Sequence, residues 1–273
     1  MINIQGTTAG ICRIKKLIPQ IDSVYKTVKG VGLPIKMYIP DYKCDNSQTA
    51  ILVIHGGGWY AVKKEIDKWN GGWMNYQAQY YADKGYVSAV ISYRSIDINE
   101  DTTVFDLVED CKDAITYIRE QAEFDNLIIM GDSAGGHLAV MIGMDDGMGV
   151  DMVIAANPVL DLTEKTWKYT AKTKEERIIA SPALNIKKVN ARFLVMHGNK
   201  DTVVDYRISK KFCEDMKKQG NQAEFIELDG AKHAFILSGY ESSDEQINEY
   251  MAIIDKCIDK NCKARNETVG IIQ

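Results

Sequence analysis

A serine flanked by glycines is the first feature of the sequence that could perform covalent chemistry. Residues 131–135 read GDSAG, with Ser133 at the centre. They lie between a short apolar run, Leu127–Met130, and a segment with helical spacing, Ala134–Met144. A serine on a sharp turn from strand to helix presents its Oγ at the edge of a sheet, and small neighbours allow the backbones to approach closely. The pattern predicts a nucleophilic serine; the alternative is that Ser133 only caps the following helix.

A glycine-rich loop is the second feature. Residues 55–59 read HGGGW and directly follow the apolar run Ala50–Ile54. Glycines leave their backbone N–H groups uncovered, and such groups can converge on the negatively charged oxygen of an acyl-transfer intermediate. We therefore expect an oxyanion hole from the amides of Gly57, Gly58 and Ala134. His55 is expected to brace the loop by hydrogen bonding.

The general base for Ser133 has to be one of four histidines. His137 lies four residues after Ser133 on the same expected helix and points away from the hydroxyl. His197 closes an apolar run and is expected to be structural. His233 follows the last expected strand, where a loop can reach across the sheet edge, so we predict it as the base.

The acid that orients His233 is predicted to be Asp201. It follows the run Arg192–Met196 and can accept the second ring N–H of the histidine. Asp205 and Asp161 are the alternatives. The order serine, aspartate, histidine along the chain is the one that this architecture requires.

The surrounding elements alternate between strands and helices, which indicates an α/β fold with a mostly parallel, twisted sheet covered on both faces. A hairpin with a turn at residues 30–32 opens the chain. The expected strands are Val24–Val28, Ile35–Ile39, Ala50–Ile54, Val87–Ser92, Leu127–Met130, Val153–Ala156, Arg192–Met196 and Ala223–Leu228. The expected helices are Asn75–Lys84, Val104–Glu123, Ala134–Met144, Tyr206–Gln219 and Asp244–Cys262.

One segment interrupts this alternation. Residues 160–190 are polar and charged, and we expect them to form a small cap over the carboxyl edge of the sheet, where active sites of open α/β sheets lie. At 273 residues the chain has the length of one domain, so we expect residues 1–273 to form a single domain with this cap as its insertion.

Composition excludes several classes of partner. The chain has 33 basic and 38 acidic residues, for a net charge of −5, and no basic block that would favour nucleic acid or an anionic membrane. No apolar run is long enough to span a bilayer. The six cysteines lack the spacing of a zinc site and are expected to be free thiols. We therefore expect a soluble, cytoplasmic protein that needs no metal and no cofactor.

Four motifs together resemble a known family. The set HGGGW, GDSAGGH, HGNKD and GAKHAF is similar to α/β-hydrolase esterases and lipases related to hormone-sensitive lipase, and within them to small feruloyl or acetyl-xylan esterase-like enzymes. The resemblance extends from about Tyr25 to Cys257. It implies an α/β-hydrolase fold with a sheet of about eight strands and carboxylic ester hydrolysis. The implied triad is Ser133, Asp201 and His233, and the implied oxyanion hole is Gly57, Gly58 and Ala134.

Substrate preference follows less directly. The region before Tyr25 and the insertion after Leu160 are short compared with those of lipase-like members, which favours short acyl groups on a bulky sugar or aryl alcohol. Trp59, Trp73 and Trp167 are the expected substrate-binding residues, with packing of helix and cap as the alternative role. A small-molecule or glycan ester is the expected partner. A serine peptidase or amidase, or an inactive binding protein on the same fold, remain the alternatives, and the last strand could pair two subunits as a homodimer.

Overall fold

One sheet organises the computed structural model, which describes residues 17–40, 44–60, 74–96, 101–237 and 240–269. Within these residues eight strands are hydrogen-bonded in the order β1-β2-β4-β3-β5-β6-β7-β8. Their bounds are β1 Ile21–Val28, β2 Val31–Tyr38, β3 Thr49–Ile54, β4 Val87–Ile91, β5 Asn126–Asp132, β6 Met152–Ala156, β7 Arg192–Gly198 and β8 Ala223–Leu228. The sheet of about eight strands expected from the sequence is confirmed.

The sheet is antiparallel only at its first edge. β1 pairs with β2 and β2 with β4 in antiparallel fashion, and every later pair is parallel. The hairpin turn falls at Lys29 and Gly30, with φ of 50° and 80°, and not at residues 30–32 as predicted. Two residues with positive φ match the right-handed twist of the flanking strands, so Gly32 becomes part of β2.

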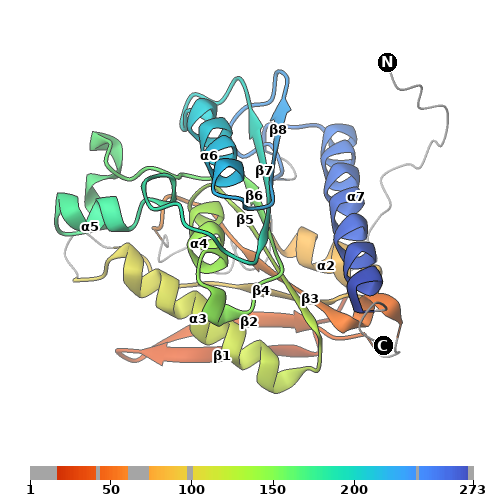
Figure 1. Cartoon of the computed structure of the whole chain (residues 1–273). Coiled ribbons are helices and arrows are strands. Elements are labelled where there is room, and N and C mark those ends of the chain that lie inside the picture. Colours follow the sequence, from red (N-terminus) through yellow and green to blue (C-terminus); the bar gives the residue numbers. More distant parts are fainter. Residues whose placement is uncertain (1–16, 41–43, 61–73, 97–100, 238–239, 270–273) are drawn as a thin grey trace, which may run out of the picture.

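Helices cover both faces, as Figure 1 shows. One face carries α3 (Val104–Gln121), α4 (Ser133–Gly143) and α6 (Tyr206–Lys218), and the other carries α2 (Asn75–Asp83) and α7 (Asp244–Val269). β3 and β4 are buried along their whole length, because helices pack on both of their faces. This explains why they read as continuous apolar runs in the sequence.

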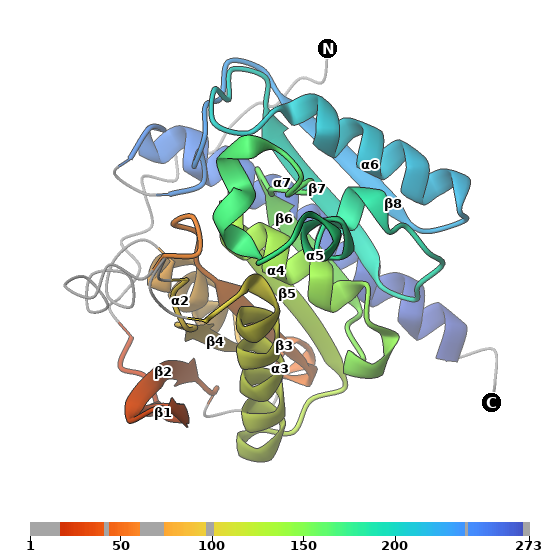
Figure 2. The ribbon, with the colours of Figure 1, turned by 90° about the vertical axis from the view of Figure 1, so that its left-hand side faces the viewer.

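The cap, residues 160–190, lies on the side of α3, α4 and α6, as Figure 2 shows for α5. It contains the short helix α5 (Lys174–Ile179) between two 3₁₀ helices, Lys165–Thr170 and Pro182–Leu184. The carbonyl oxygen of Ala180 lies 2.8 Å from Nε2 of His137 and so ties the cap to α4. Within the cap, Ser181 Oγ accepts from Leu162 N at 2.8 Å.

The ends of the sheet and of the chain complete the fold. β8 is an edge strand, and dimer formation through it stays a prediction. α7 extends to Val269, beyond the predicted end at Cys262.

The described part of the chain contains four free thiols: Cys44, Cys111, Cys213 and Cys257. None of the helices described there combines the length and the apolar character that crossing a membrane requires.

Candidate active site

The nucleophile turn, residues 131–135, is a strained connection between β5 and α4. Ser133 has a φ of 50°, a left-handed conformation that L residues adopt at a cost. A Cβ on Gly131 would lie 2.3 Å from the carbonyl oxygen of Gly135, and a Cβ on Gly135 would lie 2.2 Å from the carbonyl oxygen of Ile54. Only glycine fits at either position, so the two glycines of the motif are required by close backbone approach.

The three predicted triad residues meet at the carboxyl edge of the sheet. Nε2 of His233 lies 2.9 Å from Oγ of Ser133, and Nδ1 of His233 lies 2.7 Å from Oδ2 of Asp201. Ser133 follows β5, Asp201 follows β7 and His233 follows β8, so neighbouring strand ends bring the three together. The geometry is that of a serine hydroxyl facing an imidazole whose other nitrogen faces a carboxylate.

The two alternative acids are engaged elsewhere. Asp205 precedes α6 and accepts from the N–H of Arg207 at 3.0 Å. Asp161 accepts from the N–H of Thr163 at 2.8 Å and from its hydroxyl at 2.6 Å. Both carboxylates therefore satisfy local turns, and Asp201 is the one that contacts His233.

Four donors surround the carboxylate of Asp201. Oδ1 accepts from the N–H groups of Val203 at 2.8 Å and Val204 at 3.0 Å. Oδ2 accepts from His233 and also from Nε2 of His197 at 3.0 Å. Burial disfavours the charged form, but the hydrogen bonds from His197 and His233 outweigh it and hold the pKa of Asp201 well below its usual range. Asp201 is thus an anion at neutral pH, which suits it to stabilise an imidazolium.

The oxyanion loop, residues 55–59, lies against the nucleophile turn because β3 and β5 are neighbours. Gly57 and Gly58 have φ of 101° and 64°, and no hydrogen bond within the described residues uses their N–H groups. Ala134 is the second residue of α4, where backbone N–H groups have no partner inside the helix. Among the described residues, none of the three amides has a hydrogen-bond acceptor, so each is available to an external oxygen.

Asp132 joins the loop to the turn. Its Oδ1 accepts from the N–H of Gly56 at 2.9 Å, and a Cβ on Gly56 would lie 2.7 Å from its Oδ2. Burial raises the pKa of Asp132 to about 6, although the hydrogen bond from Gly56 opposes the shift. The first glycine of the loop is therefore required by a contact with the residue that precedes Ser133.

His55 braces the loop, as expected. Its Nδ1 lies 2.7 Å from the carbonyl oxygen of Gly56, and its ring stacks on Tyr93 at 4.4 Å. Tyr93 in turn donates to the carbonyl oxygen of His55 at 2.7 Å. Burial lowers the pKa of His55 to about 4, so the imidazole is neutral and serves to position the backbone.

Two of the predicted substrate-binding tryptophans are buried, which favours the alternative role of packing. Trp59 is completely buried, with its ring edge-on to Trp167 at 5.6 Å and to His137 at 5.3 Å. Trp167 is 8% exposed. Their ring contacts pack the oxyanion loop against the cap and α4. Trp73 lies outside the described residues.

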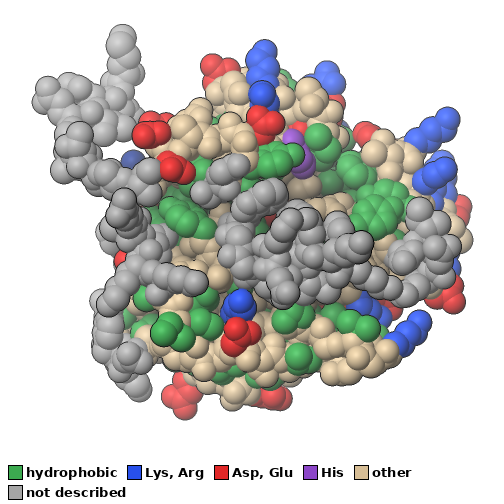
Figure 3. Space-filling model, turned by 180° about the vertical axis from the view of Figure 1, so that it is seen from behind, with side chains coloured by type: hydrophobic (Ala, Val, Ile, Leu, Met, Phe, Trp, Pro, Cys, Tyr) green, Lys and Arg blue, Asp and Glu red, His purple; other side chains and the backbone are tan. Residues whose placement is uncertain are grey.

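The side chain of His233 is partly exposed to solvent. It is the one histidine among the described residues that is not buried, with 18% of its side chain exposed. Figure 3 shows histidine at one place on the face seen from behind, beside hydrophobic side chains. His233 is thus the residue of the candidate triad with the most exposed side chain among the contacts described.

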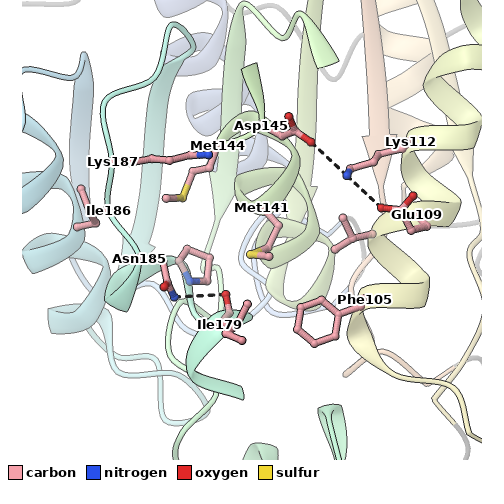
Figure 4. A pocket seen from close by; sticks show the side chains of 12 residues that line it. Phe105, Glu109, Lys112, Met141, Met144, Asp145, Ile179, Asn185, Ile186 and Lys187 are labelled. Carbon is pink, nitrogen blue, oxygen red and sulfur yellow. Dashed lines mark hydrogen bonds and ion pairs between the residues drawn. The ribbon is translucent and has the colours of Figure 1, made fainter. Parts of the chain in front are cut away.

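A separate cavity of about 680 Å³ lies between α3, α4 and the cap (Figure 4). Phe105 and Met141 contribute apolar surface, while Lys112 pairs with Glu109 at 3.0 Å and with Asp145 at 3.1 Å beside it. No residue of the candidate triad lines it.

Some residues around the site could not be assigned from motifs alone. Asp132 was visible as the variable position of GDSAG, but its contact with Gly56 depends on which strands are neighbours. His197 was assigned a structural role, and its hydrogen bond to Asp201 depends on the turn after β7. Tyr169 donates to the carbonyl oxygen of Gly58 at 3.1 Å, a contact from the cap that no sequence pattern marked.

Solved structures with this architecture include esterases. The native esterase Est2 from the Planctomycetes species Thermogutta terrifontis matches with a TM-score of 0.73 and 26% identity over 88% of this chain and 91% of that one. The same esterase is known in a propionate-bound form, which matches with a TM-score of 0.68 and 26% identity over 92% of this chain and 94% of that chain. A form phosphorylated by paraoxon matches with a TM-score of 0.69 and 27% identity over the same shares.

Curated relatives are longer proteins. The probable carboxylic ester hydrolase LipM of Mycobacterium tuberculosis is 24% identical over 234 residues, which is 73% of this chain and 52% of LipM. Dipeptidyl peptidase family member 2 of Caenorhabditis elegans is 28% identical over 160 residues, 54% of this chain and 18% of the peptidase. The chain thus spans about half of LipM and under a fifth of the peptidase.

The match to a family model covers the part of the chain that builds the nucleophile turn and the oxyanion loop. The model called BD-FAE matches residues 35–172, from β2 into the cap. Taken with the sheet order and the esterase structures of the same fold, this match means that the chain belongs to the BD-FAE family of α/β-hydrolases.

Proposed function

We propose that the protein is a serine carboxylesterase that hydrolyses its substrate through an acyl-enzyme. The observation that carries this proposal is the chain of hydrogen bonds from Ser133 Oγ to His233 and on to Asp201, at 2.9 and 2.7 Å. A hydroxyl with this partner can lose its proton as it attacks, which makes it a nucleophile at neutral pH.

The first half-reaction forms the acyl-enzyme. Oγ of Ser133 attacks the carbonyl carbon of the ester while Nε2 of His233 takes the hydroxyl proton. The C–O bond to the alcohol then breaks, and His233 returns the proton to the leaving oxygen. Asp201 accepts the Nδ1–H throughout and stabilises the imidazolium. In the second half-reaction water replaces the alcohol by the same steps and releases the acid.

The oxyanion hole is assigned to the amides of Gly57, Gly58 and Ala134. Negative charge develops on the carbonyl oxygen during each attack, and fixed donors stabilise it without reorganisation. Two features support this assignment: the N–H groups of Gly57 and Gly58 have no hydrogen bond within the described residues, and Asp132 holds the loop against the nucleophile turn.

Short acyl esters of a sugar or aryl alcohol are the proposed substrates. The cap between β6 and β7 is small, and its largest helix has six residues. The similar Thermogutta esterase has been solved with propionate and with butyrate bound. Near the oxyanion loop, Tyr60 and Tyr169 stack at 4.8 Å and are only partly buried, which offers aromatic surface to the alcohol part.

Hydrolysis of a p-nitrophenyl ester series from acetate to palmitate tests the proposal on wild type and Ser133→Ala in parallel. We expect activity on acetate to butyrate, falling toward long chains, and a loss of at least about 10³-fold in the variant. Retained hydrolysis in Ser133→Ala overturns the assignment of the nucleophile. Rates that rise toward palmitate overturn the short-acyl substrate class.

Amide hydrolysis is the second candidate, favoured by the similarity to a dipeptidyl peptidase over 160 residues. Matched p-nitroanilide substrates separate it from ester hydrolysis. Labelling with a fluorophosphonate separates both enzymes from a binding protein, because only an activated serine reacts. We expect labelling of wild type at Ser133, hydrolysis of the esters, and rates on the anilides that are lower by orders of magnitude.

A further inference from the structure

A second histidine stands behind the candidate triad. His197 is the sixth residue of β7 and is completely buried. Its Nε2 lies 3.0 Å from Oδ2 of Asp201, and its Nδ1 lies 2.8 Å from Oγ of Ser209 on α6. Ser209 is also completely buried. Two buried polar groups thus continue the triad away from solvent.

The direction of these hydrogen bonds follows from what each group can donate. A carboxylate only accepts, so the ring nitrogens that face Oδ2 of Asp201 both carry hydrogen. In the tautomer with its single N–H on Nε2, Nδ1 of His197 accepts and the hydroxyl of Ser209 donates to it. Asp201 thereby selects the tautomer of His197, and Ser209 provides a partner for the other ring nitrogen.

The two oxygens of Asp201 are held differently. Backbone N–H groups of Val203 and Val204 fix Oδ1. Oδ2, the oxygen that meets His233, has His197 as its other described partner. Removing His197 leaves Oδ2 with His233 as its one remaining described partner, so the carboxylate can turn about its Cβ–Cγ bond and lose its alignment.

We propose that His197, held at its other ring nitrogen by Ser209, is a positioning residue that keeps the Oδ2 atom of Asp201 in line with His233. The inference rests on the proposed function for its effect on rate, but its structural part stands on the hydrogen bonds of buried residues. It gives the histidine of the HGNKD motif a role in addition to its position near the end of β7.

The variants at position 197 separate the effect of the hydrogen-bond donor from the effect of the volume that the side chain fills. His197→Gln places an amide N–H at the same number of bonds from the backbone as Nε2, so it can still donate to Asp201. His197→Leu fills the site without a donor. Ser209→Ala removes the hydroxyl that holds Nδ1 of His197. Ser88→Ala is its matched control, because Ser88 is also completely buried and donates to the carbonyl oxygen of Ala78 at 2.6 Å.

Kinetics on a p-nitrophenyl ester give the first readout. In His197→Leu we expect kcat to fall about 10- to 100-fold, since misplacing a reacting group by about 1 Å has this effect, with KM unchanged within about twofold. His197→Gln is expected to recover most of the rate, Ser209→Ala to lose about 3- to 10-fold, and Ser88→Ala to keep its kcat. A wild-type kcat in His197→Leu, or equal losses in the Gln and Leu variants, overturns the proposal.

Crystal structures of His197→Gln and His197→Leu give a readout that does not need activity. We expect Oδ2 of Asp201 to stay within hydrogen-bonding distance of Nδ1 of His233 in the Gln variant and to turn away in the Leu variant. An unmoved carboxylate in both overturns the positioning role. If wild type hydrolyses no ester while Asp201 turns away only in the Leu variant, the proposed function fails and the positioning role stands.

Discussion

Asp132 is a buried carboxyl group that connects the two loops of the site. It is 2% exposed, and its Oδ1 accepts the N–H of Gly56. Burial raises its pKa to about 6 from an ordinary value of 3.8. A raised carboxyl pKa means that ionisation costs more in the folded protein than in the unfolded chain. The residue that aligns the oxyanion loop therefore opposes folding at neutral pH.

Asp132→Asn should reveal this cost as a dependence on pH. Below about pH 4 the group is protonated in both states; between pH 4 and 6 the unfolded chain ionises first, and wild type loses stability as pH rises. With about 1.4 kcal/mol for each pKa unit, the loss approaches 3 kcal/mol above pH 6. The free energy of unfolding of the variant, relative to wild type, should rise by this amount between pH 4 and 7 in urea titrations. A difference that stays constant with pH would contradict the shifted pKa.

At the level of single residues, chemistry could be predicted better than packing. Ser133, His233 and Asp201 were identifiable because their types and their places after expected strands limit the alternatives. The burial of Trp59 could not be predicted, because a tryptophan after three glycines can turn inward or outward, and only contacts with His137 and Trp167 decide which. The second histidine, His197, depends on a turn that no motif specifies.

Among the elements, α3 is fastened to the first strands by one buried carboxylate. Asp110 on α3 is completely buried. Its carboxylate accepts from Nε of Arg94 at 2.8 Å and from Nζ of Lys26 at 2.7 Å. It also accepts from the backbone N–H of Arg94 at 3.0 Å. These contacts join α3 to β1 and to the segment after β4, which includes Tyr93 and its hydrogen bond to the oxyanion loop.

Asp110→Ala should lower the free energy of unfolding by about 3–5 kcal/mol, because it leaves two cations without their buried partner. Asp113→Ala is the control. Asp113 also pairs with Lys26, at 2.6 Å, but is 52% exposed, so its loss should cost less than about 1 kcal/mol. Urea unfolding of both variants gives the comparison. Equal losses would mean that the pairing of Asp110 is not what fastens α3.

The elements themselves were largely predictable, and their ends were not. Buried parallel strands such as β3 read as apolar runs between turn residues, so their existence followed from the sequence. α7 exceeds its predicted end at Cys262 because residues 263–269 lack apolar spacing, and a helix can continue where nothing stops it. The hairpin turn was displaced because Lys29 adopts a positive φ that glycine normally supplies.

On the scale of the whole molecule, the sheet separates two hydrophobic layers. α3, α4 and α6 bury one layer, and α2, α7 and the segment around Phe235 bury the other. Side chains of each central strand alternate between the two layers, so every strand contributes to both. We expect the layers to be lost together, as in a single domain.

Ile115→Ala on α3 and Ile254→Ala on α7 test this expectation from opposite faces. Both side chains are at most 1% exposed, and each truncation should cost about 2–5 kcal/mol. Each should shift one common transition, observed at the same urea concentration by far-UV circular dichroism and by tryptophan fluorescence. Ile179→Ala, at a position 59% exposed, should shift it by under about 0.5 kcal/mol. Separate transitions for the two faces would contradict a single domain.

Ser133 and His233 are 100 positions apart in the chain. The site is therefore completed only after the segments between them have been synthesised and folded. A nascent chain that has reached β6 already holds the nucleophile turn and the oxyanion loop, but it has neither Asp201 nor His233. Its serine is then an ordinary alcohol, unable to attack the esters of the cell in which it is being made. We expect reactivity only once β8 has paired with β7, and we expect it to be lost when that edge strand detaches.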